Sequence, residues 1–221
     1  MTQSGSGTVD GRARVGQQRR AKTRAAIIAA AFEKFGDENG LFVSIEEIVE
    51  AAGVTRATFY NHFAGMADLR AALVHEVTHD FLRAVTEVLN SVPDARQRAA
   101  AGVRFYVRRA RRDPRWGWSM LNMSASGLLF GRETYRRAER TVARGMKEGV
   151  WPVPSSEIGR DILLGTTIAA MGSVLRSELP EDFPEEIAGF ALCGLGVERE
   201  EAFRFARMPL PPLPIDGPQD D

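Results

Sequence analysis

The sequence predicts an all-α protein, with a small three-helix head on its N-terminal side and a larger helical domain after it. Apolar residues recur at the spacing of one helix face in almost every segment between residues 22 and 207, as amphipathic helices require. No window alternates apolar and polar residues for long enough to indicate a strand. Glycine, proline and helix-capping residues separate the periodic segments, so the helix boundaries can be placed in order.

Composition narrows the class of protein. The chain has 221 residues, of which 44% are hydrophobic, enough to bury one large core or two small ones. Cys193 is the single cysteine, which excludes an internal disulfide and a cysteine-pair metal site. The N-terminal segment lacks the apolar core of a secretory signal, and no apolar stretch approaches the roughly 18 residues of a membrane span. We therefore expect a cytoplasmic protein with no membrane segment and no cofactor.

The charges are unevenly distributed, although 29 basic and 29 acidic residues cancel. Six basic residues and no acidic one lie between Arg12 and Arg24. Eight acidic residues and one arginine lie between Glu178 and Glu201. This asymmetry favours a polyanion as partner of the N-terminal end only. The alternative is that the basic run is a solvated tail.

Two terminal segments lack the helical pattern. Residues 1–18 are rich in glycine, serine, glutamine and arginine, so they are predicted to be a disordered basic tail. Residues 208–221 contain five prolines, and a proline-rich segment of this kind is expected to be extended.

The head is predicted to occupy residues 19–65 and to contain three short helices. Ser44 and Glu47 form the S-x-x-E pattern of a capping box, so a helix begins directly after Ser44. The other boundaries follow from glycines that end helices and from a threonine that caps one. The first helix is placed from about Lys22 to Asp37, the second ends at Gly53, and the third lies between Thr55 and Gly65.

Residues 66–207 are predicted to form the larger helical domain. Its first helix is long, because apolar residues follow a helical spacing from Leu69 to Val88. Proline, serine and glycine then mark the limits of the later helices. These are expected at about 94–112, from 114 in a short tryptophan-rich segment, at 128–148, from 156 through Gly172, around Ile187–Leu195, and at 198–207.

The segment from Ser44 to Phe63 has the layout of a helix-turn-helix motif, with two short helices joined by a tight turn. Small alanines before the turn allow the two helices to cross closely. Gly53 is placed where the chain needs a positive φ angle, and Val54 is placed in the angle between the helices.

The second helix of this motif is unusually rich in hydrogen-bond donors and carries no acidic residue. Arginine and asparagine can bond to base edges in the major groove, while threonine, tyrosine and histidine can reach phosphates. The donors are Arg56, Thr58, Tyr60, Asn61 and His62, and the start of the first helix adds Arg20, Lys22, Thr23 and Arg24. The sequence therefore predicts that this helix binds double-stranded DNA.

The run A-A-G-V-T-x-x-T-F-Y-x-H-F within Ser44–Phe63 resembles the signature of the TetR family of transcriptional regulators, and the resemblance covers about residues 20–81. It implies phosphate contacts for Tyr60 and His62, base-facing positions for Arg56, Ala57 and Asn61, and a backbone or base contact for Thr58. The predicted DNA-binding set is Arg24, Ser44, Thr55, Arg56, Ala57, Thr58, Tyr60, Asn61 and His62.

This sequence departs from the family pattern at two places. Ala57 stands where the family often has glycine or proline. Gly65-Met66 stands where it usually has a lysine, so one phosphate contact is missing and the basic arm before the first helix could replace it.

A cluster of aromatic and methionine residues predicts an effector pocket in the larger domain, because such side chains commonly line small-molecule sites. The alternative is that the cluster is ordinary core and that the protein is a DNA-binding regulator without an effector. The candidates are Phe105, Trp116, Trp118, Met120, Met123 and Phe130, for a small apolar or amphipathic effector. Nearby arginines form a solvated face or neutralise an acidic effector: Arg104, Arg108, Arg109, Arg111 and Arg112.

Small residues at near-helical spacing predict a homodimer interface on the helix that starts near Ile158, because small residues let helices approach closely. The resemblance adds the helix around Ile187 and places both in a four-helix bundle with a second copy. The predicted interface residues are Ile158, Ile162, Gly165, Ala169, Gly172, Ile187, Phe190 and Ala191.

His75, Glu76 and His79 match the H-E-x-x-H pattern of zinc hydrolases. Zinc catalysis needs a third protein ligand, and the remaining histidine, His62, is already assigned to the DNA-binding helix. A metallohydrolase is therefore a remote alternative, and we expect neither a metal site nor an enzyme.

These inferences combine into one expected mechanism. A homodimer binds a palindromic operator with two recognition helices, and an effector in the larger domain shifts the long fourth helix and changes their spacing. The expected effect on transcription is repression by occlusion.

Overall fold

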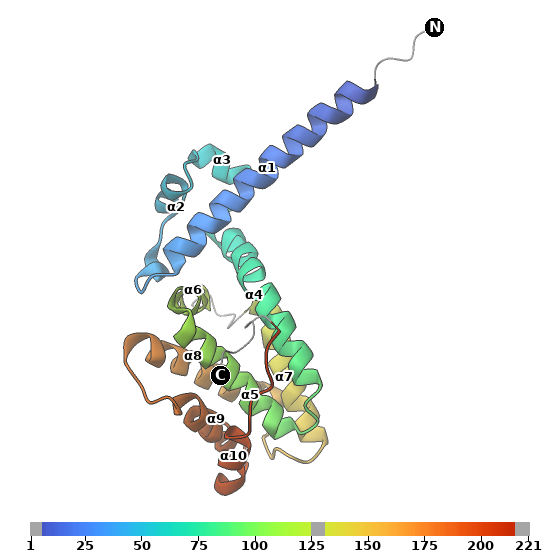
Figure 1. Cartoon of the computed structure of the whole chain (residues 1–221), viewed down its shortest axis with the longest axis vertical. Helices are drawn as coiled ribbons and strands as arrows, with labels where there is room; N and C mark the ends of the chain where they lie inside the picture. Colours follow the sequence, from blue (N-terminus) through green and yellow to red (C-terminus); the bar gives the residue numbers. More distant parts are fainter. Residues whose placement is uncertain (1–5, 125–130, 215–221) are drawn as a thin grey trace.

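The computed structural model describes residues 6–124 and 131–214, and it places their side chains except at 6–13, 77, 78, 131 and 132. Within these ranges every regular element is helical and no strand occurs, as predicted (Figure 1). The elements are α1 (Ser6–Phe35), the 3-10 turn η1 (Gly40–Phe42), α2 (Ile45–Ala51), α3 (Arg56–Tyr60), α4 (Met66–Asn90), α5 (Ala95–Arg112), α6 (Pro114–Ser124), α7 (Gly131–Lys147), α8 (Ser156–Arg176), α9 (Phe183–Gly194) and α10 (Arg199–Ala206).

Helix α1 is much longer than the sequence pattern indicated. It is continuous from Ser6 to Phe35, whereas residues 1–18 were expected to be a disordered tail and the helix to begin near Lys22. Extending an existing helix needs no new nucleation step, and the arginine, glutamine and alanine residues of this segment are adequate helix formers. The N-terminal half of α1 consequently projects beyond α2 and α3 (Figure 1).

The head is held by one small apolar core beneath α2 and α3. Ile48 of α2 and Phe59 of α3 are fully buried against α1 and the start of α4. Both predicted caps are present. The Ser44 hydroxyl accepts from the Glu47 amide at 3.3 Å while the Glu47 carboxylate accepts from the Ser44 amide at 2.8 Å, and the Thr55 hydroxyl accepts from the Thr58 amide at 3.1 Å.

Helix α4 joins the two domains as one rigid element. Leu69 and Leu73 are buried in the core of the head, while Phe81 and Val85 are buried in that of the C-terminal domain. A helix of 25 residues is about 37 Å long. A displacement of one end of α4 therefore moves side chains in both cores.

Helix α6 makes a second, polar joint with the head. The buried Asn122 side chain donates to the Phe35 carbonyl at 2.9 Å and to the Asp37 carbonyl at 2.8 Å, and the Ser119 hydroxyl donates to the Phe32 carbonyl at 3.2 Å. These contacts fasten α6 to backbone carbonyls at and just after the C-terminal end of α1, where carbonyls run out of helical partners.

Helix α5 is the centre of the C-terminal domain and packs against α6, α7, α8, α9 and α10. Arg104 of α5 is buried and donates two hydrogen bonds to Glu185 of α9, at 2.9 and 2.6 Å. Its third nitrogen donates to the Met208 carbonyl at 2.6 Å. Residues 209–213 are non-helical, as their prolines indicated, and Leu213 is buried.

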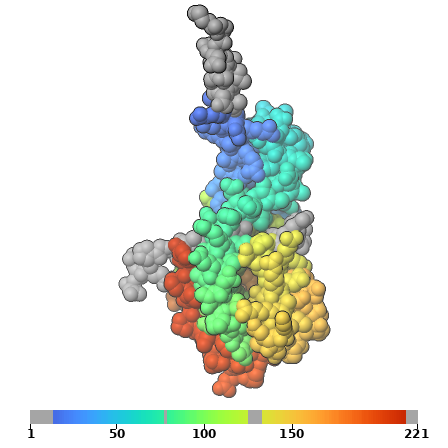
Figure 2. Space-filling model, turned by 90° about the vertical axis from the view of Figure 1, so that its right-hand side faces the viewer, coloured from blue at the N-terminus to red at the C-terminus, as the bar shows by residue number. Residues whose placement is uncertain are grey.

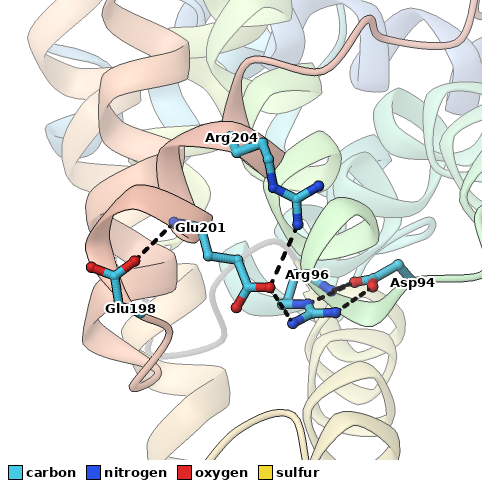
Figure 3. A network of polar contacts seen from close by, with 5 residues as sticks. All are labelled: Asp94, Arg96, Glu198, Glu201 and Arg204. Carbon is cyan, nitrogen blue, oxygen red and sulfur yellow. Dashed lines mark hydrogen bonds and ion pairs between the residues drawn. The ribbon is translucent and has the colours of Figure 1, made fainter.

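A polar network fastens α10 to the start of α5 (Figure 3). Arg96 donates to Asp94, the N-cap of α5, at 2.7 Å and to Glu201 of α10 at 2.8 Å. Glu201 also accepts from Arg204 at 3.5 Å, and its amide donates to Glu198 at 3.2 Å (Figure 3). The network fixes the end of the domain that lies farthest from the head (Figure 1).

Candidate functional site

The turn between α2 and α3 has the geometry that the helix-turn-helix pattern requires. Gly53 has a φ of 65°, a conformation that costs other residues energy because of their Cβ atom. The Val54 amide donates to the Val49 carbonyl at 3.0 Å, closing the end of α2. The partly buried Val54 side chain packs on the core of the head, so the crossing of α2 and α3 is fixed.

One side of α3 and the residues just after it faces inward and the other faces solvent. Phe59 and Phe63 are 0% and 2% exposed and hold the segment in the core. Tyr60 is 47% exposed. Of the other predicted contact residues, Arg24, Thr55, Arg56, Ala57 and Asn61 are exposed, whereas Ser44, Thr58 and His62 are half-buried. The buried Phe59 and Phe63 thus form an aromatic base beneath the exposed donors, and these donors are accessible to a macromolecule.

Arg56 is paired with a carboxylate that the local sequence pattern does not indicate. Its guanidinium forms an ion pair with Glu46 of α2 and lies 5.8 Å from the centre of the Tyr60 ring. The hydrogen bond with Tyr60 and the charge of Glu46 raise the pKa of Arg56. Both members of the ion pair are mostly exposed, so the pair is weak and Arg56 can exchange Glu46 for another acceptor.

A basic cluster lies at the C-terminal end of α3, next to His62. Arg20 of α1 donates to the Asn61 carbonyl at 3.1 Å, and the Arg24 guanidinium lies 5.3 Å from the centre of the Phe63 ring. Burial, followed by the charges of Arg20 and Arg24, lowers the pKa of His62 below its ordinary value. His62 is therefore neutral at neutral pH, in a positive environment that suits an anion.

Ser44 and Thr55 have structural tasks in addition to any contact with a ligand. Each hydroxyl accepts a hydrogen bond from the first turn of its own helix. They therefore hold the N-terminal ends of α2 and α3 in place.

A second candidate site is an open cavity of about 280 Å³ in the C-terminal domain. It lies between α4, α5, α7 and α8, and the surface in Figure 2 is hollowed between α4 in green and α7 in yellow. Apolar side chains and arginines line it together: Leu82, Val85, Thr86, Leu89 and Asn90 of α4; Arg98, Ala99, Gly102, Val103 and Tyr106 of α5; Thr134, Arg137, Ala138, Arg140, Thr141 and Arg144 of α7; and Leu163, Leu164 and Thr167 of α8.

Models of known families match both the head and the C-terminal domain. The model described as "Bacterial regulatory proteins, tetR family" matches residues 27–73, and that described as "Tetracyclin repressor-like, C-terminal domain" matches residues 94–208. The second match alone covers more than half of the chain. The chain belongs to the TetR family of transcriptional regulators.

Individual proteins are also similar to this chain. The structure of RolR with its ligand resorcinol is 28% identical, with a TM-score of 0.73 over 89% of this chain and 99% of RolR. A TetR-family regulator from Marinobacter aquaeolei VT8, at 19% identity and a TM-score of 0.59 over 81% of this chain and 98% of its own, shares the fold. The transcriptional activator FasR of Mycolicibacterium smegmatis is 29% identical over 87 residues, which span 39% of this chain and 40% of FasR.

The residues predicted to line an effector pocket lie elsewhere than the 280 Å³ cavity. Trp116, Met120 and Met123 are at most 2% exposed and belong to the core. Trp118 is also buried, and Phe105 lines a different hollow, beside Pro209–Leu213. Phe130 lies outside the described residues. Aromatic composition marked a packed core because the sequence does not show which apolar groups are in contact with one another.

The predicted dimer face is only partly exposed. Ile158 and Phe190 are 46% and 49% exposed, Ala169 is exposed, and Ile162, Gly165 and Ile187 are half-buried. Gly172 and Ala191 are a correction, because both are buried within the subunit. A Cβ atom on Gly172 would lie 2.7 Å from the Arg176 side chain, whereas one on Gly165 would meet no atom within 4 Å.

The H-E-x-x-H residues on α4 do not form a metal centre with other described residues. His75, Glu76 and His79 are exposed, and the two imidazoles stack with ring centres 5.3 Å apart. No group of three potential metal ligands occurs in the described part of the chain. Membership of the TetR family, whose members are regulators rather than enzymes, removes the metallohydrolase alternative.

Helix α8 is long and apolar enough to meet the length and composition of a membrane span, the one such helix among the described residues. This helix corrects the expectation that no apolar stretch approaches the length of a membrane span. In this fold α8 packs against α5, α6, α7 and α9, and it carries the buried Arg160, which donates to Glu139 at 2.8 Å. It is a core helix of the domain.

Proposed function

We propose that this TetR-family regulator is a cytoplasmic, effector-responsive repressor that binds a palindromic operator as a homodimer. The observation that carries the proposal is the outward face of α3, where Arg56, Tyr60 and Asn61 are exposed above the buried Phe59. A helix seated in this way can enter the major groove with its donors directed at the bases.

The proposed contacts divide into two kinds. Arg56, Ala57 and Asn61 face base edges and supply sequence preference. Tyr60, His62, Thr58 and Arg24 contact the backbone, and Ser44 and Thr55 present the first turns of their helices to phosphates. Arg20 and Arg24 on α1 supply positive charge in place of the lysine that this chain lacks after α3, because backbone contacts depend on charge more than on identity.

The proposed dimer joins the exposed faces of α8 and α9 with those of a second copy. Ile158 and Phe190 are large apolar side chains about half exposed on these helices, and Gly165 leaves space for close approach of a partner helix. Two copies related by a twofold axis place two α3 helices on successive major grooves about 34 Å apart. Phe190→Asp should shift the protein from dimer to monomer in analytical ultracentrifugation and weaken operator binding with it.

The proposed effector site is the 280 Å³ cavity. Helix α4 contributes its second half to the cavity lining and its first turns to the core of the head. An occupant that displaces α4 therefore alters the position of α3, with a coupling of about 1–3 kcal/mol in typical allosteric proteins. The neighbour RolR was solved with the small aromatic ligand resorcinol, which is consistent with a site of this size.

Binding-site selection from random duplex DNA tests the DNA-binding face. Arg56→Ala and Asn61→Ala should each weaken binding to the selected operator by about 10- to 100-fold and relax the preference at one base pair. Arg83→Ala, an exposed arginine toward the far end of α4, is the control and should leave the affinity unchanged. Full operator affinity in both α3 variants would refute the assignment of α3 to the groove.

Repression is tested separately with the selected operator placed in a promoter. Repression by occlusion predicts lower reporter expression with the protein present and recovery on adding an effector. The FasR relative is an activator by name, and an increase in expression with the protein present would replace repression by activation without affecting the DNA-binding face.

A further inference from the structure

The charged residues that line the 280 Å³ cavity are all positive among those that the structure describes. Four arginines contribute to its lining, Arg98 from α5 and Arg137, Arg140 and Arg144 from α7. No aspartate or glutamate occurs among the lining residues that the structure describes. A cavity that served an apolar molecule alone would gain nothing from this arrangement, because charged groups are costly to keep beside apolar surface.

Arg98 is the most constrained of the four arginines. It is only 6% exposed, and one of its terminal nitrogens donates to the Val92 carbonyl at the C-terminal side of α4. The other terminal nitrogen, Nη2, is buried and has no hydrogen-bond partner among the described residues. A buried guanidinium with an unused donor is rare unless an anion completes it.

The charges around Arg98 do not neutralise it. Burial, and after it the positive charge of Arg144, lowers the pKa of Arg98, and the negative charges of Glu148 and Asp94 oppose this only in part. Glu148 is already bonded to Arg144 at 2.7 Å and Asp94 to Arg96 at 2.7 Å. The Arg144 side chain is 57% exposed, so Arg144 lies at the open side of the cavity, whereas Arg98 is buried.

The remainder of the cavity suits an apolar body. Arg98, Gly102 and Tyr106 lie four residues apart on one face of α5, so the Cα atoms of Arg98 and Tyr106 are separated by about 12 Å along the axis. Between them, a Cβ atom on Gly102 would meet only Leu89, at 3.7 Å. Burial raises the pKa of Tyr106 to about 12, so its hydroxyl stays neutral beside Thr134, 3.4 Å away.

We infer that the effector is a small monocarboxylate with an apolar body, whose carboxylate binds Arg98 with Arg144 and whose body lies over Gly102 toward Tyr106. A carboxylate accepts two parallel hydrogen bonds from a guanidinium, which is the strongest pairing open to it. A single negative charge matches the one buried arginine of the lining, because Arg137 and Arg144 are already paired with Glu133 and Glu148 outside the cavity. The inference rests on the proposed function in taking this cavity as the effector site.

Pairs of a carboxylate and its matching alcohol test whether binding requires a negative charge on the effector. The full chain is used, without DNA. Octanoate is compared with octanol, and benzoate with benzyl alcohol, by titration calorimetry and by the shift in melting temperature. At least one carboxylate should bind at least tenfold more tightly than its alcohol and raise the melting temperature. Equal affinities within both pairs, or no binding by any of the four probes, would overturn the inference.

Substitutions of single arginines test which residue binds the carboxylate of the probe. Arg98→Gln should abolish the preference for the carboxylate and leave the weak affinity for the alcohol unchanged, while Arg98→Lys should retain part of the preference. Arg136→Gln removes an exposed arginine of helix α7, which also carries Arg144, at a position that does not line the cavity, and this variant should bind like the wild type. A preference that persists in Arg98→Gln would place the carboxylate elsewhere.

Two further measurements keep the outcomes separate. If Arg98→Gln does not fold, Arg144→Gln at the open side of the cavity tests the same contact and should reduce the preference. Operator binding of the probe-free protein is measured independently. Its failure would refute the proposed function, whereas loss of the charge preference alone refutes only the nature of the effector.

Discussion

Arg56 in the head and Arg98 in the C-terminal domain differ in both burial and pairing. Arg56 is mostly exposed and has Glu46 as a partner within the chain, whereas Arg98 is buried and has an unused donor. Arg104 is a third case, because it is as buried as Arg98 but all three of its nitrogens donate, two to Glu185 and one to the Met208 carbonyl. Burial alone therefore does not distinguish a structural arginine from a binding one; the distinction lies in which donors remain unused.

The largest effect is expected from removing the partner of the structural arginine. Glu185→Gln leaves Arg104 buried without a counter-charge, and breaking a buried ion pair in this way costs about 3–5 kcal/mol. Chemical denaturation should therefore show a large loss in the free energy of unfolding. Arg98→Met, which removes a buried charge that has no acidic partner, should change the free energy of unfolding by less than Glu185→Gln does. A similar loss in both variants would mean that the two arginines have the same role.

A smaller effect is expected at the floor of the cavity. Gly102 lies inside helix α5, where alanine is more favourable than glycine by about 1 kcal/mol, and the added methyl group has room beside Leu89. Gly102→Ala should raise the melting temperature while weakening the binding of octanoate or benzoate. Ala101→Gly on the same helix, outside the cavity lining, is the control and should lower stability without the same effect on binding. Stabilisation together with tighter binding would exclude Gly102 from the site.

A modest pH effect is expected at the DNA-binding face. The pKa of His62 is lowered in the free protein by burial and by Arg20 and Arg24, whereas a phosphate beside it would raise that pKa. Binding then takes up a proton, so operator affinity should increase as the pH falls from 8 toward 6. The gain is lost as the pH rises through the pKa of the bound state. His62→Gln should flatten this dependence; an affinity that falls with falling pH in the wild type would contradict a phosphate contact.

The smallest effect is expected at Glu46. Its exposed ion pair with Arg56 must be broken before Arg56 can bond to a base, and its negative charge repels phosphates at every sequence. Glu46→Gln should therefore strengthen binding to random DNA severalfold and binding to the selected operator by more, which raises the ratio of specific to non-specific affinity at a fixed salt concentration. Glu50→Gln, on the same helix α2, serves as a control for net charge. An unchanged ratio would mean that Glu46 has no part in specificity.

The head could be predicted closely because its signals are local. The capping box of Ser44 and Glu47, the positive φ at Gly53 and the cap at Thr55 each depend on residues a few positions apart. The aromatic base of α3 follows from the same spacing. The Arg56–Glu46 pair was missed, because it joins two helices across the turn and is visible only once their crossing is known.

The C-terminal domain could be predicted only as a set of helices. The cavity is formed by side chains from four helices, including Leu82 and Leu163, which are far apart in the sequence. Arg98 carries no local signal that separates it from the other arginines of α5, and the tryptophan-rich segment turned out to be core. The length of α1 was underestimated for a related reason, because its N-terminal half has no apolar stripe.

The most direct test of the account is a structure of the protein bound to its selected operator. The account predicts two copies related by a twofold axis, with α3 of each in the major groove, the Arg56 guanidinium bonded to a base edge and no longer to Glu46, and His62 next to a phosphate. A complex in which α3 lies away from the groove, or in which Arg56 remains bonded to Glu46 and contacts no base, would contradict it.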